Sequence, residues 1–406
     1  AEAFVEFGPA PDSMKAKTAA QPCAKGATVL FVLDELKNDA AYCYRFRYRP
    51  AGSEARAEFA ASDVGRFHTP RPPGSAFTFT IQSDSHLDSN VTPEVYGQAL
   101  ANALADKPDF HMDIGDTFMT DKRRAFREAA PQYLAQRYWF GRLCHSAPLF
   151  MALGNHDGEA GYAGSGPDQI AGWSYEQRTR LFPPPLIPEG TTTGSVMYTG
   201  RTDWRDGGGA NYFAFAWGSA LFCVLDPFWG TKSKMRGGGG VAGELEMTDT
   251  SWSMSLGSAQ YEWLTRTLSE SKAKLKFIFT HHLVGGIGRV ARGGVEAAPF
   301  FEWGGKNADG SEGFAKNRPG WAMPVHALLV KHGVTAVFHG HDHMFVRSEL
   351  DGITYQCVPQ PGNPRGGTRT AADYGYVSGT ILGSPGHLRV QVTDSAAKVA
   401  RSEEHT

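Results

Sequence analysis

Hydrophobic positions alternate with polar ones in the first 70 residues. Segments 3–7 and 41–49 show a period of two, and segment 28–33 is continuously apolar. Successive side chains of a β-strand point to opposite faces, so this pattern predicts short strands, and we expect a small β sandwich. Three prolines between residues 70 and 73 interrupt any regular element and predict a linker. We therefore place a domain boundary between residues 72 and 73.

From residue 76 onward, apolar runs end repeatedly in polar clusters. The runs are FTFTIQ, FHMDI, PLFMAL, LKFIFT and TAVFH, and between them lie amphipathic stretches at 93–105, 125–143, 258–271 and 324–332. This alternation of buried strands and helices indicates an α/β domain whose parallel strands carry polar loops at their carboxyl ends. Segments 212–215 and 221–225 predict a further pair of strands. Residues 158–211 break the alternation, and we expect an insertion over the strand ends.

Composition excludes several classes of protein. The chain has 406 residues, 41% of them hydrophobic and 20% charged, which predicts a folded protein with one large domain and a smaller companion. Forty Lys and Arg against 42 Asp and Glu give a net charge of -2, so no nucleic-acid-binding patch is indicated. No apolar run reaches the roughly 18 residues of a membrane span. The composition carries no signal of oligomeric state.

The cysteines and the amino terminus bear on the compartment. Five cysteines without a CxxC pair predict neither a zinc ribbon nor a fully paired disulfide framework. Cys23 and Cys43 either form a disulfide between facing strands or remain two buried thiols. The chain begins at Ala1 without a visible leader, which a removed leader or a trimmed chain would both explain.

Five polar clusters stand at the ends of the apolar runs, and they contain six of the 14 histidines. Residues two apart at a strand end project to the same side, so Asp84 with His86, and His341 with His343, are expected to face one centre each. Carboxylate, amide oxygen and imidazole ligands suit Fe, Mn or Zn, and Asp116 is the natural bridge between two ions. The clusters are Asp84-Ser85-His86, Gly115-Asp116, Gly154-Asn155-His156-Asp157, His281-His282 and Gly340-His341-Asp342-His343.

Two adjacent metal ions are suited to phosphate ester hydrolysis, because they lower the pKa of a bridging water and offset charge on the phosphoryl oxygens. We therefore expect a metal-bound hydroxide to attack phosphorus, with Asp116 and His156 as the catalytic residues. His156 is placed to hydrogen-bond a phosphoryl oxygen or to protonate the leaving alkoxide. Asp157 and Asp342 are candidates to orient imidazoles.

The order and content of the five clusters resemble the calcineurin-like metallophosphoesterase superfamily, whose pattern runs D-x-H, G-D, G-N-H-[DE], H and G-H-x-H. The resemblance covers roughly residues 76–392. It implies a four-layer α/β-β/α sandwich and two divalent or mixed-valence metal ions. It also implies that His156 is the catalytic histidine. By this resemblance one ion takes Asp84, His86, Asp116 and His343, and the other takes Asp116, Asn155, His281 and His341.

The first 70 residues resemble the fibronectin type III-like domain that precedes the catalytic domain of purple acid phosphatases. The similar segments are AFVEFGPAP, LDELKNDAAYCYRFRY and GRFHTP. This resemblance implies a secreted or periplasmic enzyme. One departure matters: Met119 stands where the purple enzymes have a tyrosine that ligates ferric iron. We therefore expect an enzyme that is not purple and whose metal pair is open among Fe, Mn and Zn.

Several neighbouring residues are candidates for contact with a substrate. His281 is favoured over His282 as a ligand because it comes first after the strand, and His282 is expected to line the pocket. Arg289 and Arg292 are candidates to clamp a phosphate, with a solvated arginine on a Gly-rich loop as the alternative. His339 is expected to be structural.

The sequence thus predicts a metal-dependent hydrolase of small-molecule phosphate esters. A phosphomonoesterase is the first choice because of the similarity to purple acid phosphatases. A phosphodiesterase or nucleotide hydrolase on the same site is the alternative, since none of the five clusters separates the two. A remote alternative from another class is a non-catalytic binding or adhesion module with a vestigial metal site.

Overall fold

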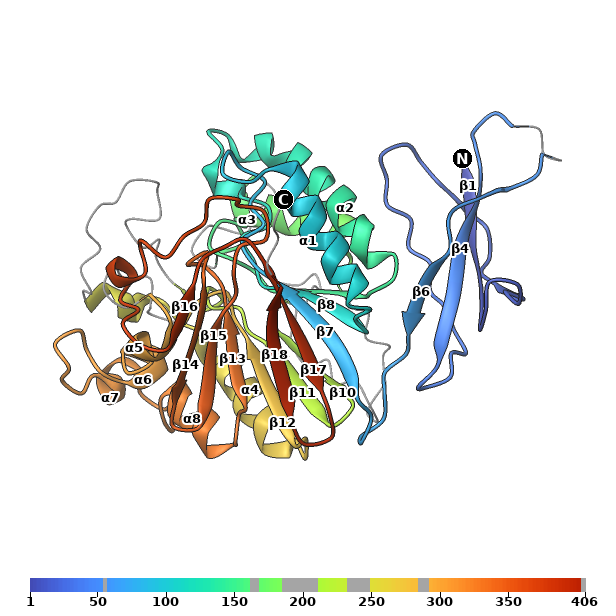
Figure 1. The fold of residues 1–406 in the computed structure, drawn as a ribbon. Helices are drawn as coiled ribbons and strands as arrows, with labels where there is room; N and C mark the ends of the chain where they lie inside the picture. The colour runs from blue at the N-terminus through green and yellow to red at the C-terminus, as the bar shows by residue number, and fades with distance from the viewer. Residues whose placement is uncertain (54–56, 161–167, 185–210, 232–248, 284–291, 403–406) are drawn as a thin grey trace.

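Residues 1–72 and 73–406 were predicted to fold separately, and the computed structural model shows separate sheets in these two parts. The structure describes residues 1–53, 57–160, 168–184, 211–231, 249–283 and 292–402. Figure 1 shows the amino-terminal strands standing beside the larger part of the molecule.

The amino-terminal part is one six-stranded antiparallel sheet. Its centre is the pair β1 and β4, in register from Glu2 opposite Arg49 to Gly8 opposite Cys43. The strands predicted at 3–7 and 41–49 are confirmed. The strands are β1 (Glu2–Gly8), β2 (Ala16–Lys17), β3 (Gln21–Pro22), β4 (Ala41–Arg49), β5 (Ala60–Ala61) and β6 (Gly65–His68).

The strand predicted at 28–33 was wrong, because this segment pairs with no strand among the described residues. It packs on the sheet through side chains instead, with the ring of Phe31 6.0 Å from that of Phe46. Leu30 and Val32 stay largely exposed. An apolar run predicts contact with a hydrophobic surface but does not by itself decide whether the backbone joins a ladder.

The larger part contains two sheets. The five-stranded sheet has the order β18-β17-β7-β8-β9, and the seven-stranded sheet has the order β10-β11-β12-β13-β15-β14-β16. Strands β7, β8 and β9 are parallel, as are β11, β12, β13 and β15. The bounds are β7 (Phe77–Gln82), β8 (Phe110–Asp113), β9 (Leu149–Met151), β10 (Phe213–Trp217), β11 (Ala220–Val224), β12 (Leu275–Phe279), β13 (Ala336–His339), β14 (Phe345–Leu350), β15 (Ile353–Cys357), β16 (Thr380–Leu382), β17 (His387–Val392) and β18 (Ala397–Ser402).

The two sheets face each other across a core rich in phenylalanine. Phe79 of the first sheet lies 5.2 Å from Phe222 and 6.5 Å from Phe338 of the second, measured between ring centroids. Within β12, Phe277 belongs to this core, whereas Ile278 belongs to the core between the sheet and its helices. This alternation buries both faces of the strand, which explains why the strands read as continuous apolar runs.

Helices cover the outer faces of both sheets, so the predicted four-layer α/β-β/α sandwich is confirmed. Figure 1 shows α1 and α2 together on the side of β7 and β8. Side chains of α4 and α8 join the second sheet in one core cluster. The helices are α1 (Pro93–Ala105), α2 (Ala130–Cys144), α3 (Ile170–Leu181), α4 (Gly257–Glu270), α5 (Gly294–Ala297), α6 (Phe301–Gly304), α7 (Phe314–Asn317) and α8 (Val325–Lys331), with short 3-10 turns at Thr120–Lys122, Phe126–Ala129, Asp249–Ser253 and Ala372–Tyr374.

Helix α2 begins later than the predicted start at residue 125. A 3-10 turn at Phe126–Ala129 precedes it, and Pro131 occupies its first turn. Proline has no backbone N–H, so it fits the first turn of a helix and not its interior. The predicted helix at 93–105 is confirmed residue for residue, with Pro93 at its start.

The linker and the amino-terminal sheet are fastened to the larger part by polar contacts. The hydroxyl of Tyr44 donates to the carbonyl of His145 at 3.0 Å. Arg71 makes a two-pronged ion pair with the carboxylate of Asp109, with nitrogen to oxygen distances of 2.8 to 3.0 Å. Bidentate pairs of this kind fix orientation as well as distance.

All five cysteines are free thiols, so Cys23 and Cys43 form no disulfide.

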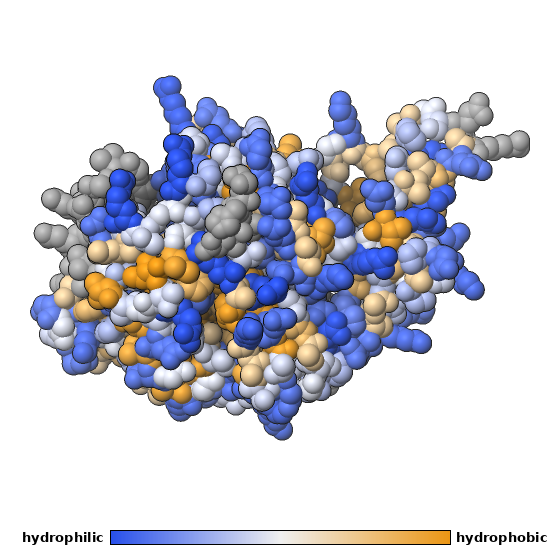
Figure 2. Space-filling view, viewed as in Figure 1, coloured by the Kyte–Doolittle hydropathy of each residue, from blue (hydrophilic) through white to orange (hydrophobic). Residues whose placement is uncertain are grey.

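In Figure 2, which has the same viewpoint as Figure 1, hydrophobic residues gather over β14 and β16. Among the helices of the described residues, none has the length and apolar character needed to cross a bilayer.

Candidate metal centre

The five polar clusters meet at one edge of the sandwich, where the carboxyl ends of β7, β8, β9, β12 and β13 come together. The loops are bonded to one another through their backbones. The N–H of Asp84 donates to the carbonyl of Gly115 at 2.9 Å, and that of His86 donates to the carbonyl of Asp116 at 3.2 Å. The N–H of Gly340 donates to the carbonyl of His281 at 2.8 Å. Parallel strands deliver their following loops to one edge, so the fold itself creates the cluster.

The backbone at this edge is strained. Five non-glycine residues of the clusters have positive φ, a region that non-glycine residues adopt uncommonly, although Asp and His enter it more readily than most. Each such residue costs on the order of 1 kcal/mol, and such conformations persist where the surroundings require them, commonly at functional sites. The residues are Asp84 (φ 59°), His86 (52°), Asp116 (55°), His341 (74°) and His343 (57°).

Glycine allows two of the loops to approach closely. A β-carbon added to Gly154 would lie 2.2 Å from the backbone nitrogen of Asp116, far inside van der Waals contact. Gly115 has a φ of 102°, and a β-carbon there would lie 2.4 Å from the nitrogen of Gly154. The glycines in G-D and G-N-H therefore set the distance between these two loops.

Each of the two aspartates has one oxygen held by the backbone and one directed toward histidines. Asp84 Oδ2 accepts the N–H of His341 at 2.9 Å, and Asp84 Oδ1 lies 3.4 Å from His343 Nε2. Asp116 Oδ1 accepts the N–H of His156 at 2.8 Å, and Asp116 Oδ2 lies 3.2 Å from His281 Nε2. His86 Nε2 is 3.7 Å from both Asp84 Oδ1 and Asp116 Oδ2.

Many of the atoms that face this centre are buried without a hydrogen-bond partner among the described residues. Leaving a buried polar atom unpaired costs about 1–3 kcal/mol. Carboxylate, amide and imidazole donors of this kind fit a metal ion, which would satisfy them together. The unpaired atoms are Asp84 Oδ1, His86 Nε2, Asn155 Oδ1, His281 Nε2 and both ring nitrogens of His282 and His341.

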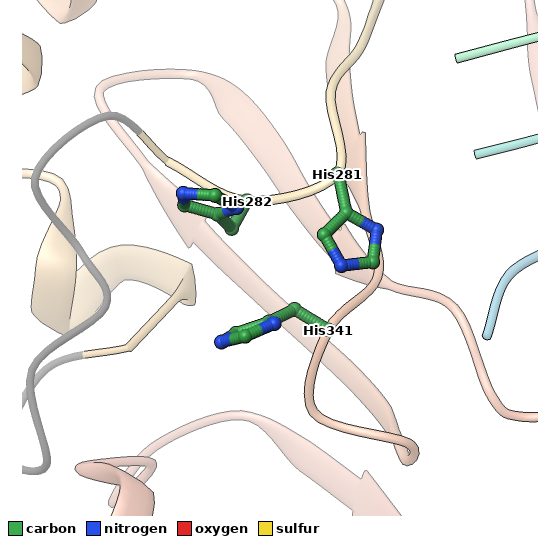
Figure 3. Close-up of side chains that lie close together, drawn as sticks. All are labelled: His281, His282 and His341. Atoms are coloured by element: carbon green, nitrogen blue, oxygen red, sulfur yellow. The ribbon is translucent and has the colours of Figure 1, made fainter. Parts of the chain in front are cut away.

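The ligand atoms form three overlapping groups in which all atoms lie within 4.8 Å of one another. Asp84, His86 and His343 form the first group, and Asp84, Asp116 and His281 form the second. The third comprises His281, His282 and His341, which Figure 3 shows. Asp84 is shared by the first two groups and His281 by the last two, so the three groups form one continuous set of candidate ligands. The structure thus brings six of the seven predicted ligands into these groups; the seventh, Asn155, presents its unpaired Oδ1 in the loop after β9.

Electrostatics in the centre follow from burial and charge. Burial favours a raised pKa for Asp84, but His343 and His281 nevertheless hold that pKa well below its usual value. Burial lowers the pKa of His282 and of His341 far below the usual value, with His281 adding to both effects. Neutral imidazole is the form that binds metal, so both rings are in the ligating state at neutral pH.

In His281 and His86, the ring nitrogen Nδ1 is held by a group outside the set of candidate ligands. His281 Nδ1 lies 2.9 Å from the carbonyl of Ile114, and His86 Nδ1 lies 3.2 Å from Asp88 Oδ2. Such contacts fix the tautomer so that Nε2 is left for a metal. Asp88 was not found by sequence reasoning, because a carboxylate in the loop segment DSNVTP carries no distinguishing pattern.

Asp157 and Asp342 were predicted to orient imidazoles, but their carboxylates bind other groups. Asp157 accepts backbone N–H groups of Gly154, Asp116, Thr117 and Phe118 at 2.7 to 3.0 Å. Asp342 accepts Arg292 Nε and the hydroxyl of Tyr376, both at 2.6 Å. Short loops expose their own backbone donors, and these surround the carboxylate of Asp157, whereas side chains from other segments reach Asp342.

Two glutamines of α2 were also missed. Gln132 Nε2 donates to the carbonyl of His86 and, at 3.1 Å, to that of Thr117. Gln136 Nε2 donates to Ser85 Oγ at 2.7 Å and to the same Thr117 carbonyl at 2.9 Å. Their spacing of four residues places them on one face of the helix, which was the only signal in the sequence.

His156 lies beside the centre with its ring held by Asp121. Its Nε2 is 4.0 Å from Asp116 Oδ2, and its Nδ1 is 2.9 Å from Asp121 Oδ1. Asp121 begins the charged run DKRR, which looks like solvated surface in the sequence.

The residues predicted to contact a substrate have different surroundings in the structure. Arg292 is not a solvated arginine: it is bonded to Asp342 and its guanidinium lies 4.0 Å from the ring centroid of Tyr374. Arg289 lies outside the described residues. His282 is fully buried, with its ring 4.8 Å from that of Phe228. His339 is also buried and stacks on Tyr376 at 6.5 Å.

A cavity of about 710 Å³ opens beside the centre. It is lined on one side by residues of the clusters and on the other by basic and amide side chains, together with Met119. Among its lining residues are His86, Asp116, His156, His341, His343, Asn90, Lys122, Arg123, Gln132 and Arg292.

Comparison with known proteins gives one matching family model and several similar solved structures. Residues 77–345 match the family model described as calcineurin-like phosphoesterase. The fold is similar to that of a purple acid phosphatase from yellow lupin (Lupinus luteus) seeds, at a TM-score of 0.59 and 16% identity over 99% of this chain and 67% of the lupin chain. A dimetal phosphatase from Danio rerio matches at a TM-score of 0.43 and 14% identity, over 80% of this chain and 98% of the other. None of the curated protein sequences compared with the chain matches it.

Proposed function

Since the chain belongs to the calcineurin-like phosphoesterase family, we propose that it hydrolyses phosphate monoesters at a centre of two metal ions. One observation carries this proposal: carboxylate and imidazole ligands form three overlapping groups that share Asp84 and His281. A single ion would leave part of this donor surface unsatisfied. Two ions a short distance apart would use all of it.

The proposed ligands follow the family pattern. One ion takes Asp84, His86, Asp116 and His343, and the other takes Asp116, Asn155, His281 and His341. The unpaired, buried ligand atoms of Asp84, His86, Asn155, His281 and His341 support this assignment. Met119 offers no phenolate oxygen, so the metals are drawn from Fe, Mn and Zn without a ferric tyrosinate.

When bound, the two ions would supply an activated water and offset charge on the phosphoryl group. The residues of the chain hold the ligands in position and supply a proton to the leaving group. His156 presents Nε2 toward Asp116, and Asp121 holds the opposite nitrogen. Through Nε2, His156 donates a proton to the leaving alkoxide, the role expected of an imidazole in this position. Asp157 holds the Asp116 loop in place through four backbone N–H groups.

The cavity supports a monoester as the first substrate class. A monoester is a dianion and needs donors beside the metals, and Lys122, Arg123 and Arg292 line the cavity. The volume of about 710 Å³ would also admit a second ester arm, so a phosphodiester or nucleotide is the alternative substrate. A non-catalytic binding module is disfavoured, because a vestigial site would not need the full set of donors.

A paired assay tests the proposal. The metal-free protein is reconstituted with Mn²⁺, Zn²⁺ or Fe²⁺, bound metal is measured by elemental analysis, and an aryl phosphate monoester is compared with a bis-aryl diester. We expect two ions per chain and faster hydrolysis of the monoester. Faster hydrolysis of the diester would make a phosphodiester the preferred substrate class. No hydrolysis of either ester from pH 5 to 9 would refute the proposal that the protein is a phosphate ester hydrolase.

Variants test the site. Asn155→Ala and His156→Ala are expected to lower turnover by about 100-fold or more. His332→Ala is the matched control, because His332 follows α8 and lies outside the centre. Wild-type turnover in both site variants would refute the assigned residues.

We also propose that residues 1–72 are a fibronectin type III-like domain and that the enzyme acts in a secreted or periplasmic location. The sequence motifs of this part support the proposal. Recovery of the natural protein from the cytoplasmic fraction alone would contradict it.

A further inference from the structure

His282 is a buried histidine whose side chain has no partner for either nitrogen among the described residues. It follows His281 directly at the end of β12 and is fully buried. A neutral imidazole carries one N–H donor and one acceptor, and leaving both unpaired in a buried position is unfavourable. A core position would be better filled by an apolar side chain of similar size. The polar ring therefore points to a ligand.

The ring of His282 is close to two proposed metal ligands. Its centroid lies 5.8 Å from that of His281 and 5.2 Å from that of His341, and those two lie 5.3 Å apart. One nitrogen from each ring falls in a group whose atoms lie within 4.8 Å of one another. Figure 3 shows the three rings around a common space, two from the loop after β12 and one from the loop after β13.

His339 shows that a histidine can be buried without lying close to other candidate ligands. Both of its nitrogens are also buried without a partner among the described residues. Its ring stacks on Tyr376, and it belongs to none of the three groups of candidate ligands. The two histidines share burial and missing partners and differ in their proximity to other ligands.

We propose that His282 is a third imidazole ligand of the ion that His281 and His341 hold. This inference rests on the proposed metal centre and extends its ligand set. Two nitrogens bound to one ion at about 2.1 Å lie no more than about 4.2 Å apart, so small side-chain rotations close the three rings on an ion. Phe228 packs against His282, with the two ring centroids 4.8 Å apart.

The added imidazole makes the two ions unequal. With Asp116 and Asn155, the ion at His281, His282 and His341 would have three imidazole nitrogens and one carboxylate, whereas the other would have two imidazole nitrogens and two carboxylates. Imidazole-rich sites favour Zn²⁺ and similar ions over hard ions such as Mg²⁺. During reconstitution with Zn²⁺ or Co²⁺, the three-histidine position should therefore fill first.

The test is a metal titration of His282→Phe and His282→Ala against wild type. Binding of Co²⁺ to the metal-free protein is followed by calorimetry and by the visible absorption of the bound ion, which depends on its ligands. We expect two ions in wild type and an affinity loss of about 10-fold or more for one ion in both variants. His339→Phe is the matched control and should titrate like wild type. If both His282 variants titrate and absorb like wild type, His282 is not a ligand.

Two further measurements distinguish metal binding by His282 from a role in packing. A packing role for His282 would lower the thermal stability of the metal-free protein and leave the Co²⁺ titration unchanged. In ¹¹³Cd-loaded wild type with ¹⁵N-labelled histidine, couplings from three imidazoles to one cadmium are expected, and two at each cadmium would overturn the inference without any variant. Failure of wild type to bind metal at all would refute the proposed function instead.

Discussion

Asp121 Oδ1 lies 2.9 Å from His156 Nδ1, and this contact directs the other ring nitrogen of His156 toward Asp116. The carboxylate comes from the loop after β8 and the histidine from the loop after β9. A carboxylate in this position fixes the tautomer of a histidine and stabilises its protonated form. Asp121 is therefore a positioning residue for the proposed proton donor.

Asp121→Asn is expected to lower kcat by about 100-fold and to leave KM and bound metal nearly unchanged. The amide offers Nδ1 a weaker partner, so the ring loses both its orientation and support for its charge. Steady-state kinetics and elemental analysis check this. Asp168→Asn is the control, because Asp168 is an exposed carboxylate paired with Arg127. A loss of metal parallel to the loss of kcat would contradict the positioning role.

Asp157→Asn is expected to destabilise the protein. Burial and Asp116 raise the pKa of Asp157 to about 7, so at pH 8 its ionised carboxylate is available to all four backbone N–H groups. The amide keeps one oxygen and leaves two buried donors without an acceptor, at a cost of about 2–6 kcal/mol in free energy of unfolding. Denaturant unfolding at pH 8 measures this. Asp12→Asn, on the exposed surface, should change little, and an equal effect in both would exclude the proposed role.

Gln132→Met is expected to weaken metal binding without direct contact to a metal. The substitution keeps the shape of the side chain and removes the hydrogen bonds to the carbonyls of His86 and Thr117. His86 has a positive φ, so its loop depends on such support, and we expect affinity for one ion to fall by about 10-fold. Gln98→Met on the exposed face of α1 is the control. Unchanged metal titration of Gln132→Met would refute this support.

Asp226 makes the stability of the protein depend on pH. Burial raises its pKa from the usual 3.8 to about 7, although Phe228 and Asn211 donate to its oxygens. The folded state therefore holds the proton more tightly than the unfolded state. This contribution to stability is complete below the unfolded pKa and is lost as pH rises through about 7.

Asp226→Asn should remove this dependence. Relative to wild type, the variant should gain stability as pH rises from 4 to 8, by no more than about 4 kcal/mol. Denaturant unfolding of both proteins across this range measures the difference, with the exposed Asp63→Asn as control. A constant difference between variant and wild type at all pH values would show that Asp226 does not titrate in this range.

The sequence by itself predicted strands buried on both faces and the polar residues that gather at their ends, whereas the four layers followed from the resemblance to the calcineurin-like superfamily. Continuous apolar runs such as LKFIFT predict strands buried on both faces, because both β-strand faces then need apolar side chains. Polar residues directly after such runs must lie at strand ends. Parallel strands bring their carboxyl ends to one edge, so local pattern and topology together indicated where Asp84, Asp116, His281 and His341 meet.

Only the tertiary structure decided which residues support this set. Asp121, Gln132 and Gln136 lie on segments whose local patterns match ordinary surface or helix, and their partners come from other loops. Arg292 was predicted to be a substrate clamp or a solvated arginine, and the structure excludes the solvated form by placing Asp342 and Tyr374 beside it. His282 and His339 are both buried without a partner for either ring nitrogen among the described residues, and only the closeness of His282 to His281 and His341 marks it as a candidate ligand. Hydrogen-bond and ligand geometry depends on distances between residues remote in the chain, and these distances are fixed by packing.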